Sequence, residues 1–330
     1  MNGEYAIQTS DLCRSFGEIK AVEALQLKVR SGEMFGLVGP DGAGKTTTIR
    51  MLCGILTPTS GTATILDNDL IHDADRIKRE IGYLSQRFSL YGDLTADENI
   101  EFFAEINKVY DYQKRRNELL EFTRLKPFRD RLAEDLSGGM KQKLALACTL
   151  IHTPKIIFLD EPTTGVDPVS RRDFWKILQS LLLEHITIVM STPYLDEAER
   201  CNRVALMAGG KVLMTEDPAT IKGRMKVDVV EVVCDRIRDG FNLLKRMPFL
   251  LDVQAFGDRL HVIVNDASTD IAAVEDSLRS NGILVNSRRV VSPSLENVFI
   301  YLLTHQEGAA PGRAPLNNEP RERGSSPEPV

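Results

Sequence analysis

Short apolar runs alternate with amphipathic stretches over the first two thirds of the chain. The apolar runs are typical of buried strands and lie at Glu33–Val38, Ile156–Leu159, Thr187–Met190 and Arg203–Met207. Apolar residues at helical spacing fill Lys45–Cys53 and Met140–Leu150. Strands that alternate with helices favour a mostly parallel sheet with helices on its faces. We therefore predict an α/β domain over residues 1–222.

One part of this domain has a different pattern. Residues 94–135 are rich in Glu, Arg, Leu and Phe at helical spacing and contain no strand-like run. Because such a segment has no strand to add to the sheet, we predict a helical subdomain over residues 93–136 that stands off the sheet.

A second unit is predicted over residues 226–304. Its strand-like runs are Val227–Cys234, Leu250–Ala255, Arg259–Asn265 and Ile283–Val291, and its helical stretches are Asp270–Ser280 and Ser294–Leu303. Pro293 is expected in the tolerated first turn of the last helix. These elements predict a small α+β domain. Residues 306–330 are mostly Pro, Gly, Glu, Arg and Ser, which predicts a disordered tail.

Composition limits the classes of function. The net charge is -6 with both signs mixed along the chain, which argues against a nucleic-acid partner. No apolar window is long enough to cross a bilayer, and Met1–Thr9 lacks the apolar core of a signal peptide. The five cysteines and five histidines are scattered without metal-binding spacing, so we expect free thiols in a reducing compartment.

A glycine-rich loop supplies the first chemical signal. The residues Gly39, Pro40, Asp41, Gly42, Ala43, Gly44, Lys45 and Thr46 match GxxxxGK[ST], after an apolar strand and at the start of a helical run. Thr47, the next residue, is assigned to the nucleotide site with them. Backbone N–H groups of such a loop surround phosphate oxygens, and the following helix directs its positive end at the same anion. Lys45 is predicted to reach the β- and γ-phosphates of ATP, and Thr46 to ligate Mg²⁺.

A pair of carboxylates supplies the second signal. Asp160 and Glu161 end the apolar run that begins at Ile156. Open α/β sheets bind ligands at the carboxyl ends of their strands, so both carboxylates should face the phosphate loop. Asp160 is predicted to hold Mg²⁺, through a water molecule, and Glu161 to act as the general base for the attacking water.

At Leu136–Gln142 the sequence resembles the signature motif of the ATP-binding-cassette (ABC) ATPases. In that family the Ser and Gly residues of this motif contact the γ-phosphate bound on the other subunit. The resemblance therefore implies that Ser137, Gly138 and Gly139 act on a second cassette, in a homodimer or a heterodimer, with ATP between the two domains. It implies the P-loop NTPase fold of an ABC nucleotide-binding domain with a helical subdomain.

Further motifs follow in the family's order. Phe16 resembles the aromatic residue that stacks on adenine. Gln86 resembles the glutamine that links the Mg²⁺ site to the helical insertion, which implies both a catalytic and a metal-binding role. Gly165–Asp167 resembles the loop that crosses to the partner, and Asn99 lies where the helical subdomain of the family begins.

One residue departs from the family pattern. Pro193 stands where the family usually has a histidine in the switch segment after a strand. Proline has neither an imidazole nor a backbone N–H, so it cannot hydrogen bond to the γ-phosphate. Slower hydrolysis is expected unless Thr192 or a water molecule substitutes; the alternative is that Pro193 is harmless because Glu161 remains.

The C-terminal third of the chain narrows the resemblance to one subfamily. The order Arg203–Val212, a small α+β unit and Ser294–Ile300 is similar to the ATPase subunits of ABC-2 type exporters, such as daunorubicin exporters. That subfamily implies transmembrane permease subunits as partners, a peripheral place on the cytoplasmic face of the membrane, and a groove near Gln86–Leu94 for a coupling helix. The cargo is not specified.

Two other functions compete with an exporter motor. A regulatory subunit that binds ATP with little turnover has Pro193 as its support. A cassette of translation or DNA repair fits less well, because one set of motifs is present and only about 90 residues separate Thr46 from Leu136.

Overall fold

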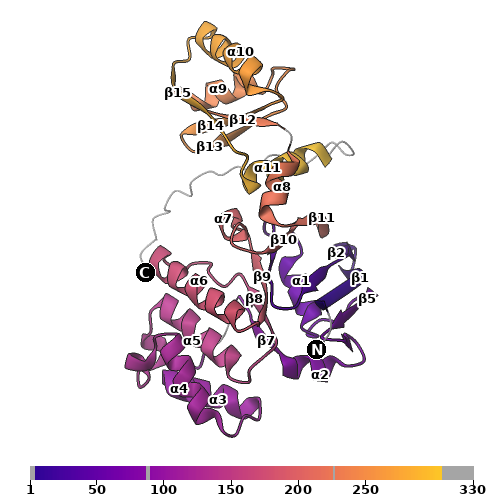
Figure 1. Ribbon diagram of the computed structural model, residues 1–330, viewed down its shortest axis with the longest axis vertical. Helices are drawn as coiled ribbons and strands as arrows, with labels where there is room; N and C mark the ends of the chain where they lie inside the picture. Colours follow the sequence, from indigo (N-terminus) through magenta and orange to yellow (C-terminus); the bar gives the residue numbers. More distant parts are fainter. Residues whose placement is uncertain (1–3, 87–89, 226, 307–330) are drawn as a thin grey trace, which may run out of the picture.

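The computed structural model describes residues 4–86, 90–225 and 227–306. The predicted tail, beyond residue 306, lies outside this range. In Figure 1 a larger unit carries two sheets, and a smaller C-terminal unit with a third sheet is joined to it beside α8 (Pro218–Arg224) and α11 (Leu295–Gln306).

The central sheet of the larger unit has six strands in the order β11-β10-β4-β9-β8-β7. The strands are β4 (Met34–Val38), β7 (Ile81–Leu84), β8 (Ile156–Asp160), β9 (Thr187–Thr192), β10 (Arg203–Ala208) and β11 (Lys211–Glu216). All neighbours are parallel except the β10–β11 pair. Every residue of β4, β8 and β9 is buried, as expected for strands covered on both faces. The mostly parallel α/β fold is therefore confirmed.

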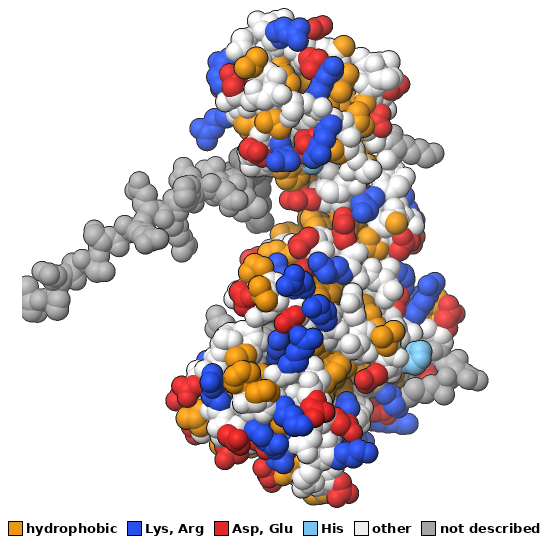
Figure 2. Space-filling model, turned by 60° about the vertical axis from the view of Figure 1, so that its left-hand side comes forward, with side chains coloured by type: hydrophobic (Ala, Val, Ile, Leu, Met, Phe, Trp, Pro, Cys, Tyr) orange, Lys and Arg blue, Asp and Glu red, His pale blue; other side chains and the backbone are white. Residues whose placement is uncertain are grey.

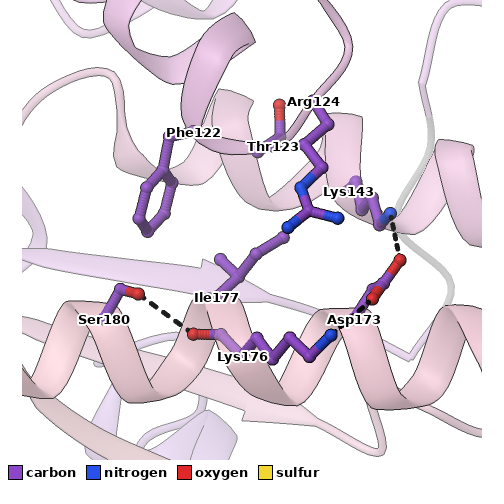
Figure 3. A pocket seen from close by; sticks show the side chains of 8 residues that line it. All are labelled: Phe122, Thr123, Arg124, Lys143, Asp173, Lys176, Ile177 and Ser180. Atoms are coloured by element: carbon purple, nitrogen blue, oxygen red, sulfur yellow. Dashed lines mark hydrogen bonds and ion pairs between the residues drawn. The ribbon is translucent and has the colours of Figure 1, made fainter.

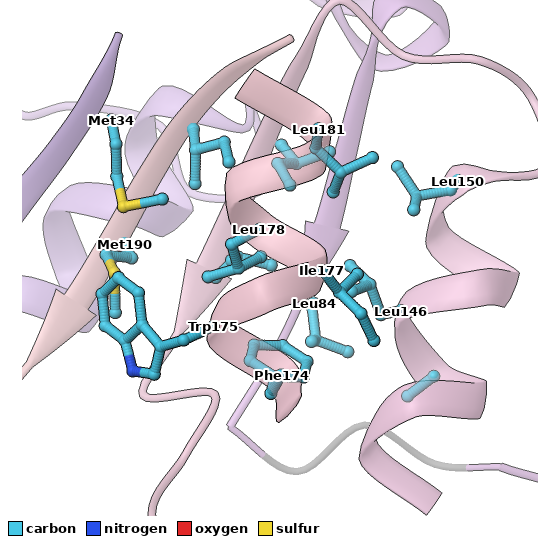
Figure 4. Packing of buried hydrophobic residues seen from close by; sticks show 14 of the residues in the cluster. Met34, Leu84, Leu146, Leu150, Phe174, Trp175, Ile177, Leu178, Leu181 and Met190 are labelled. Carbon is cyan, nitrogen blue, oxygen red and sulfur yellow. The ribbon is translucent and has the colours of Figure 1, made fainter. Parts of the chain in front are cut away.

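Helices cover both faces of this sheet. They are α1 (Lys45–Leu52), α2 (Ala74–Glu80), α5 (Gly138–Leu150), α6 (Pro168–Leu183) and α7 (Leu195–Ala198). Figure 4 shows α6 beside α5 on one face of the sheet, with Ile177 of α6 near Leu146 of α5. Asp167 caps α6 by accepting the N–H groups of residues 169 and 170, and Pro168 occupies the tolerated first position.

A second, antiparallel sheet was not predicted from the sequence. Its strands are β1 (Tyr5–Phe16), β2 (Ile19–Leu25), β3 (Lys28–Arg30), β5 (Ser60–Ile65) and β6 (Asn68–Asp69). Register shifts interrupt the pairing of β1 with β2, β3 and β5, so the alternation of apolar and polar residues that identifies a strand is broken along β1. This sheet and one face of the central sheet enclose a common core that includes Ile7, Phe35 and Phe158.

The predicted helical segment contains α3 (Ala96–Ile106), α4 (Tyr112–Phe122) and two short 3₁₀ turns, η1 (Lys126–Phe128) and η2 (Ala133–Asp135). Thr95 and Glu98 form a capping box that starts α3. The fully buried Asn99 holds the preceding loop, because its Oδ1 accepts the N–H of Tyr91 at 2.9 Å.

The C-terminal unit has the order strand, helix, strand, strand, helix, strand. Its elements are β12 (Asp228–Cys234), α9 (Ile237–Leu244), β13 (Asp252–Phe256), β14 (Arg259–Val264), α10 (Ala267–Ser280) and β15 (Val285–Val291). The antiparallel order β13-β14-β12-β15 is that of a ferredoxin-like unit. The sequence predicted all of these elements except α9, which was missed although Ile237, Phe241 and Leu244 recur at helical spacing.

The last helix, α11, returns to the larger unit. Its residues Leu295, Val298 and Phe299 join the core that also contains Ile221 of α8. The expected place of Pro293 is wrong: α11 begins at Leu295, because the Ser294 hydroxyl already accepts the N–H of Asn297 at 3.1 Å. Pro293 therefore precedes the helix.

Candidate active site

The glycine-rich loop lies between β4 and α1, and two of its glycines have no room for a side chain. A Cβ on Gly39 would lie 2.1 Å from the carbonyl oxygen of Met207. Gly44 has φ +97°, and a Cβ there would lie 2.4 Å from the carbonyl oxygen of Ala21. Only glycine fits both positions. The loop can thus lie close against β10 and β2 while α1 begins directly behind it.

Lys45 is the buried cation of the site. Its Nζ donates to the carbonyl oxygens of Gly39 at 2.8 Å and Pro40 at 3.0 Å. The same ammonium lies 3.2 Å from Oε1 of Glu161, with the two side chains 3% and 8% exposed. The structure therefore brings the predicted phosphate-binding lysine and the predicted general base into direct contact.

Asp160 has one satisfied and one unsatisfied carboxylate oxygen. Oδ1 accepts the hydroxyls of Thr46 at 2.9 Å and Ser191 at 2.6 Å. Oδ2 is buried and has no hydrogen-bond partner among the described residues. A buried carboxylate oxygen next to a threonine hydroxyl suits a hard cation such as Mg²⁺.

Ser191 was missed in the sequence analysis, although a serine inside a fully buried strand is a signal for such a role. The pairing of β8 with β9 sets it beside Asp160. Its hydroxyl donates to Asp160 and accepts the backbone N–H of Glu161 at 3.0 Å. One hydroxyl thus orients both acidic residues.

Glu161 has a left-handed backbone conformation, with φ 49°, which non-glycine residues seldom adopt. This bend follows the end of β8 and turns the side chain toward Lys45. Its Oε2 accepts a hydrogen bond from Nε2 of Gln86 at 3.0 Å. Gln86, which the sequence also assigned to the metal, is thus placed on the carboxylate of the predicted base.

Lys45, Thr46, Gln86 and Glu161 line an open groove of about 1340 Å³. Its other lining residues include Phe16, Ile19, Thr47, Thr164, Pro193 and Tyr194. Phe16 is 47% exposed, and the Arg14 guanidinium lies 4.6 Å from the centre of its ring. An exposed aromatic ring and a buried ammonium that line one groove match a ligand with a flat ring and a phosphate chain.

Pro193 reaches the groove, but Thr192 is turned away from it. The Thr192 hydroxyl donates to Oε2 of the buried Glu197 at 2.7 Å and accepts the N–H of Tyr194 at 3.0 Å. Thr192 therefore does not replace the missing histidine in this structure.

The signature residues lie outside this groove. Ser137 caps α5 by accepting the N–H of Met140 at 3.3 Å, and both Ser137 and Gly138 are exposed. Gly139 is buried against α6, and a Cβ there would lie 2.2 Å from the Ser170 hydroxyl. The structure thus presents Ser137 and Gly138 at the surface and does not bring them to Lys45 of the same chain.

A smaller pocket lies between α4, α5 and α6 (Figure 3). It has a volume of about 100 Å³, and Asp173 there pairs with Lys176 at 3.4 Å and Lys143 at 3.7 Å. It has neither glycine-rich backbone nor an exposed aromatic ring, so the larger groove is the candidate active site.

The charge of the surface and the apolar character of the helices limit the kinds of partner. Figure 2 shows Lys and Arg mixed with Asp and Glu across the face that it displays. Among the helices of the described residues, none combines the length and apolar character needed to cross a membrane.

Comparison with known proteins agrees with this geometry. The family model described as "ABC transporter" matches residues 22–164. Among solved structures, cbiO1 from Clostridium perfringens is 26% identical with a TM-score of 0.62 over 67% of this chain and 92% of that one. The dimeric ATP-binding cassette MJ0796 bound to ADP and Pi is 27% identical with a TM-score of 0.57 over 64% of this chain and 98% of that one.

Curated relatives extend the match beyond the cassette. The probable multidrug ABC transporter ATP-binding protein YbhF of Escherichia coli is 42% identical over 68% of this chain, which spans only 39% of YbhF. The Nod factor export ATP-binding protein I of Ralstonia nicotianae is 34% identical over 90% of this chain and 93% of that one. The daunorubicin/doxorubicin resistance protein DrrA of Streptomyces peucetius is 32% identical over 91% of this chain and 93% of that one. The chain therefore belongs to the ATP-binding-cassette ATPases of the ABC transporter family.

Proposed function

We propose that this protein binds ATP with Mg²⁺ in the groove, hydrolyses it, and drives an ABC-2 type exporter. The observation that carries the proposal is the convergence of Lys45, Glu161 and Gln86 beside the Thr46–Asp160 pair. These groups come from three separate segments and meet at the carboxyl ends of the parallel strands, where α/β sheets bind ligands.

Each group has a role in the proposed reaction. The loop amides and Lys45 bind the phosphates, and Phe16 stacks on adenine. Glu161 accepts the proton of the attacking water, while Gln86 and Ser191 hold its carboxylate and backbone in place. Mg²⁺ held by Thr46 and Asp160, with Gln86 nearby, would neutralise charge on the phosphate oxygens.

A second cassette completes the site in this proposal. Ser137 and Gly138 are exposed at the N-terminus of α5, so their N–H groups and the helix end are available to a phosphate on a partner. ATP would then lie between two cassettes, and hydrolysis would let them separate. The dimeric state of MJ0796 supports this arrangement.

Permease subunits are the proposed membrane partners, with this chain peripheral on the cytoplasmic face. The names of the DrrA and Nod factor export relatives support a role in export. An apolar hollow of about 250 Å³ between β7 and α3 is a suitable docking place, because Ile55 and Ile106 are more than half exposed there. Tyr83, which lines this hollow, is three residues before Gln86, so docking there would move the glutamine. The hollow differs from the groove predicted near Gln86–Leu94, which includes residues 87–89 outside the described range.

The regulatory alternative has one specific observation in its favour. Pro193 lines the groove, and Thr192 is held by Glu197 and does not substitute for a histidine. In that alternative the protein forms ATP-dependent dimers but releases little phosphate.

The test is phosphate release by concentrated protein with Mg-ATP, compared with a Glu161→Gln preparation. Removing the base should lower turnover by about 100-fold or more and trap an ATP-bound dimer, seen by size-exclusion chromatography. Equal, negligible release by both proteins, with a dimer in each, would favour the regulatory alternative. Equal but substantial release would show that Glu161 is not the base.

A further inference from the structure

Glu197 of α7 is a carboxylate buried outside the ATP groove. Its side chain is 1% exposed, yet it carries an ionisable group into a region that apolar residues could fill. Burying a carboxylate is unfavourable unless hydrogen bonds and a cation compensate for the lost water. The contacts that compensate here come from three different segments of the active site.

The first contact reaches the segment that carries the general base. Thr163, two residues after Glu161, donates its hydroxyl to Oε1 of Glu197. Thr163 is itself 1% exposed, so water does not compete for this hydrogen bond. The position of the Glu161 bend is therefore tied to Glu197.

The second contact reaches the switch segment. Thr192 donates its hydroxyl to Oε2 of Glu197 at 2.7 Å, and the N–H of Tyr194 donates back to that hydroxyl at 3.0 Å. These two bonds bracket Pro193, which has no N–H of its own. The switch segment is thus fixed through Glu197 and not through a side chain at position 193.

The third contact reaches the first turn of α6, which directly follows the loop of Gly165–Asp167. Nε of Arg171 lies 3.6 Å from Oε1 of Glu197, and its guanidinium lies 4.8 Å from the centre of the Tyr194 ring. The backbone N–H of Arg171 donates to the carbonyl of Asp167 at 2.8 Å. Glu197 is thereby joined to the segment proposed to cross to the second cassette.

We propose that Glu197 is a positioning residue for ATP hydrolysis: it holds the base segment, the switch segment and the crossing loop in one arrangement. This inference rests on the proposed ATPase function. Because the phosphate loop makes none of these contacts, loss of Glu197 should change turnover much more than ATP binding.

The primary test is Glu197→Gln, which keeps the size of the side chain but places an amide NH₂ against a hydroxyl or the guanidinium. We expect at least a tenfold lower kcat with KM for ATP changed less than about threefold. Glu199→Gln, in the same short segment but 42% exposed, is the matched control and should leave kcat unchanged. A Glu197→Gln protein with kcat within twofold of the parent would overturn the proposal.

A double-mutant cycle separates positioning from general destabilisation. Thr192→Val should lower kcat by itself, and combining it with Glu197→Gln should add little, because both changes break one hydrogen bond. Losses that multiply fully would show that the two residues act independently, contrary to the proposal.

Hydrogen exchange tests the same idea without turnover, so failure of the ATPase function is distinguishable from failure of the Glu197 role. Glu197→Gln should speed exchange together in residues 161–164, 168–172 and 192–195. Faster exchange confined to α7 would overturn the positioning role even if the parent protein hydrolyses ATP.

Discussion

Two buried carboxylates with cation partners, Glu161 and Glu231, lie in different units and have different surroundings. Glu161 has one cation, Lys45, at 3.2 Å, and it borders the 1340 Å³ groove. Glu231 lies on the C-terminal sheet with Nε of Arg289 at 2.7 Å, Nη1 of Arg259 at 3.2 Å and Nε2 of His261 at 3.5 Å.

The difference shows that a buried ion pair does not by itself identify a functional site. The hydrogen bond from Arg289, with that from Arg259, holds the pKa of Glu231 at about 2, so this carboxylate stays ionised and occupied by its neighbours. Lys45 also donates to two backbone carbonyls, and phosphate oxygens are stronger acceptors for an ammonium. A phosphate ligand can therefore take Lys45 from its present acceptors, whereas the ion pairs of Glu231 are structural.

Removing one cation from each site is the strongest test of whether the first pair binds a ligand and the second is structural. Lys45→Ala should weaken ATP binding by at least about 100-fold, because several charge-assisted hydrogen bonds to phosphate are lost. Titration with a fluorescent ATP analogue measures this loss.

Arg289→Ala is the control for that change. It removes a cation from Glu231 but should leave ATP affinity unchanged, since β15 is not part of the groove. Retained tight binding by Lys45→Ala, or weakened binding by Arg289→Ala, would contradict the division into a ligand site and a structural site.

A smaller effect is expected at Pro193. Pro193→His adds a hydrogen-bond donor to the groove that Glu161 also lines. If the missing donor limits turnover, kcat should rise by about tenfold, within the range that one well-placed donor contributes. Steady-state phosphate release measures it, with Tyr194→Phe as a control for disturbance of the segment. No increase would mean that Glu161 and its partners suffice.

The elements with strong local signals were predictable from the sequence. Buried parallel strands such as β4 and β8 are continuous apolar runs, and the glycine-rich loop stands at a strand-to-helix junction. The antiparallel sheet was not predictable, because the shifts along β1 disrupt its pattern. Long-range pairing, absent from any local window, is what creates that sheet.

The residues of the candidate site likewise fall into those that a local motif identifies and those that only long-range packing brings together. Lys45, Asp160 and Glu161 stand in recognisable motifs, so their types and spacing alone suggested phosphate and metal chemistry. Ser191 and Glu197 have no such motif, since their roles arise only when β9 pairs with β8 and α7 packs behind them. The pairing of Glu161 with Lys45 likewise depends on segments more than a hundred residues apart.

The smallest expected effect concerns Glu231, and it tests the structural half of the comparison. Glu231→Gln should lower the free energy of unfolding of the C-terminal unit by about 1–2 kcal/mol at pH 7, because two charged hydrogen bonds become weaker. Hydrogen exchange in β12 measures this, and Glu161→Gln should leave that exchange unchanged.

The lowered pKa of Glu231 determines how the difference in stability between the parent protein and Glu231→Gln depends on pH. A carboxyl with a folded pKa of about 2 and an ordinary value of 4.5 stabilises the fold fully above pH 4.5. That contribution falls as the pH drops from 4.5 toward 2, since the unfolded chain then binds the proton first. The parent protein and Glu231→Gln should therefore converge in stability on acidification, while a constant difference down to pH 3 would mean that the arginines do not hold the Glu231 charge.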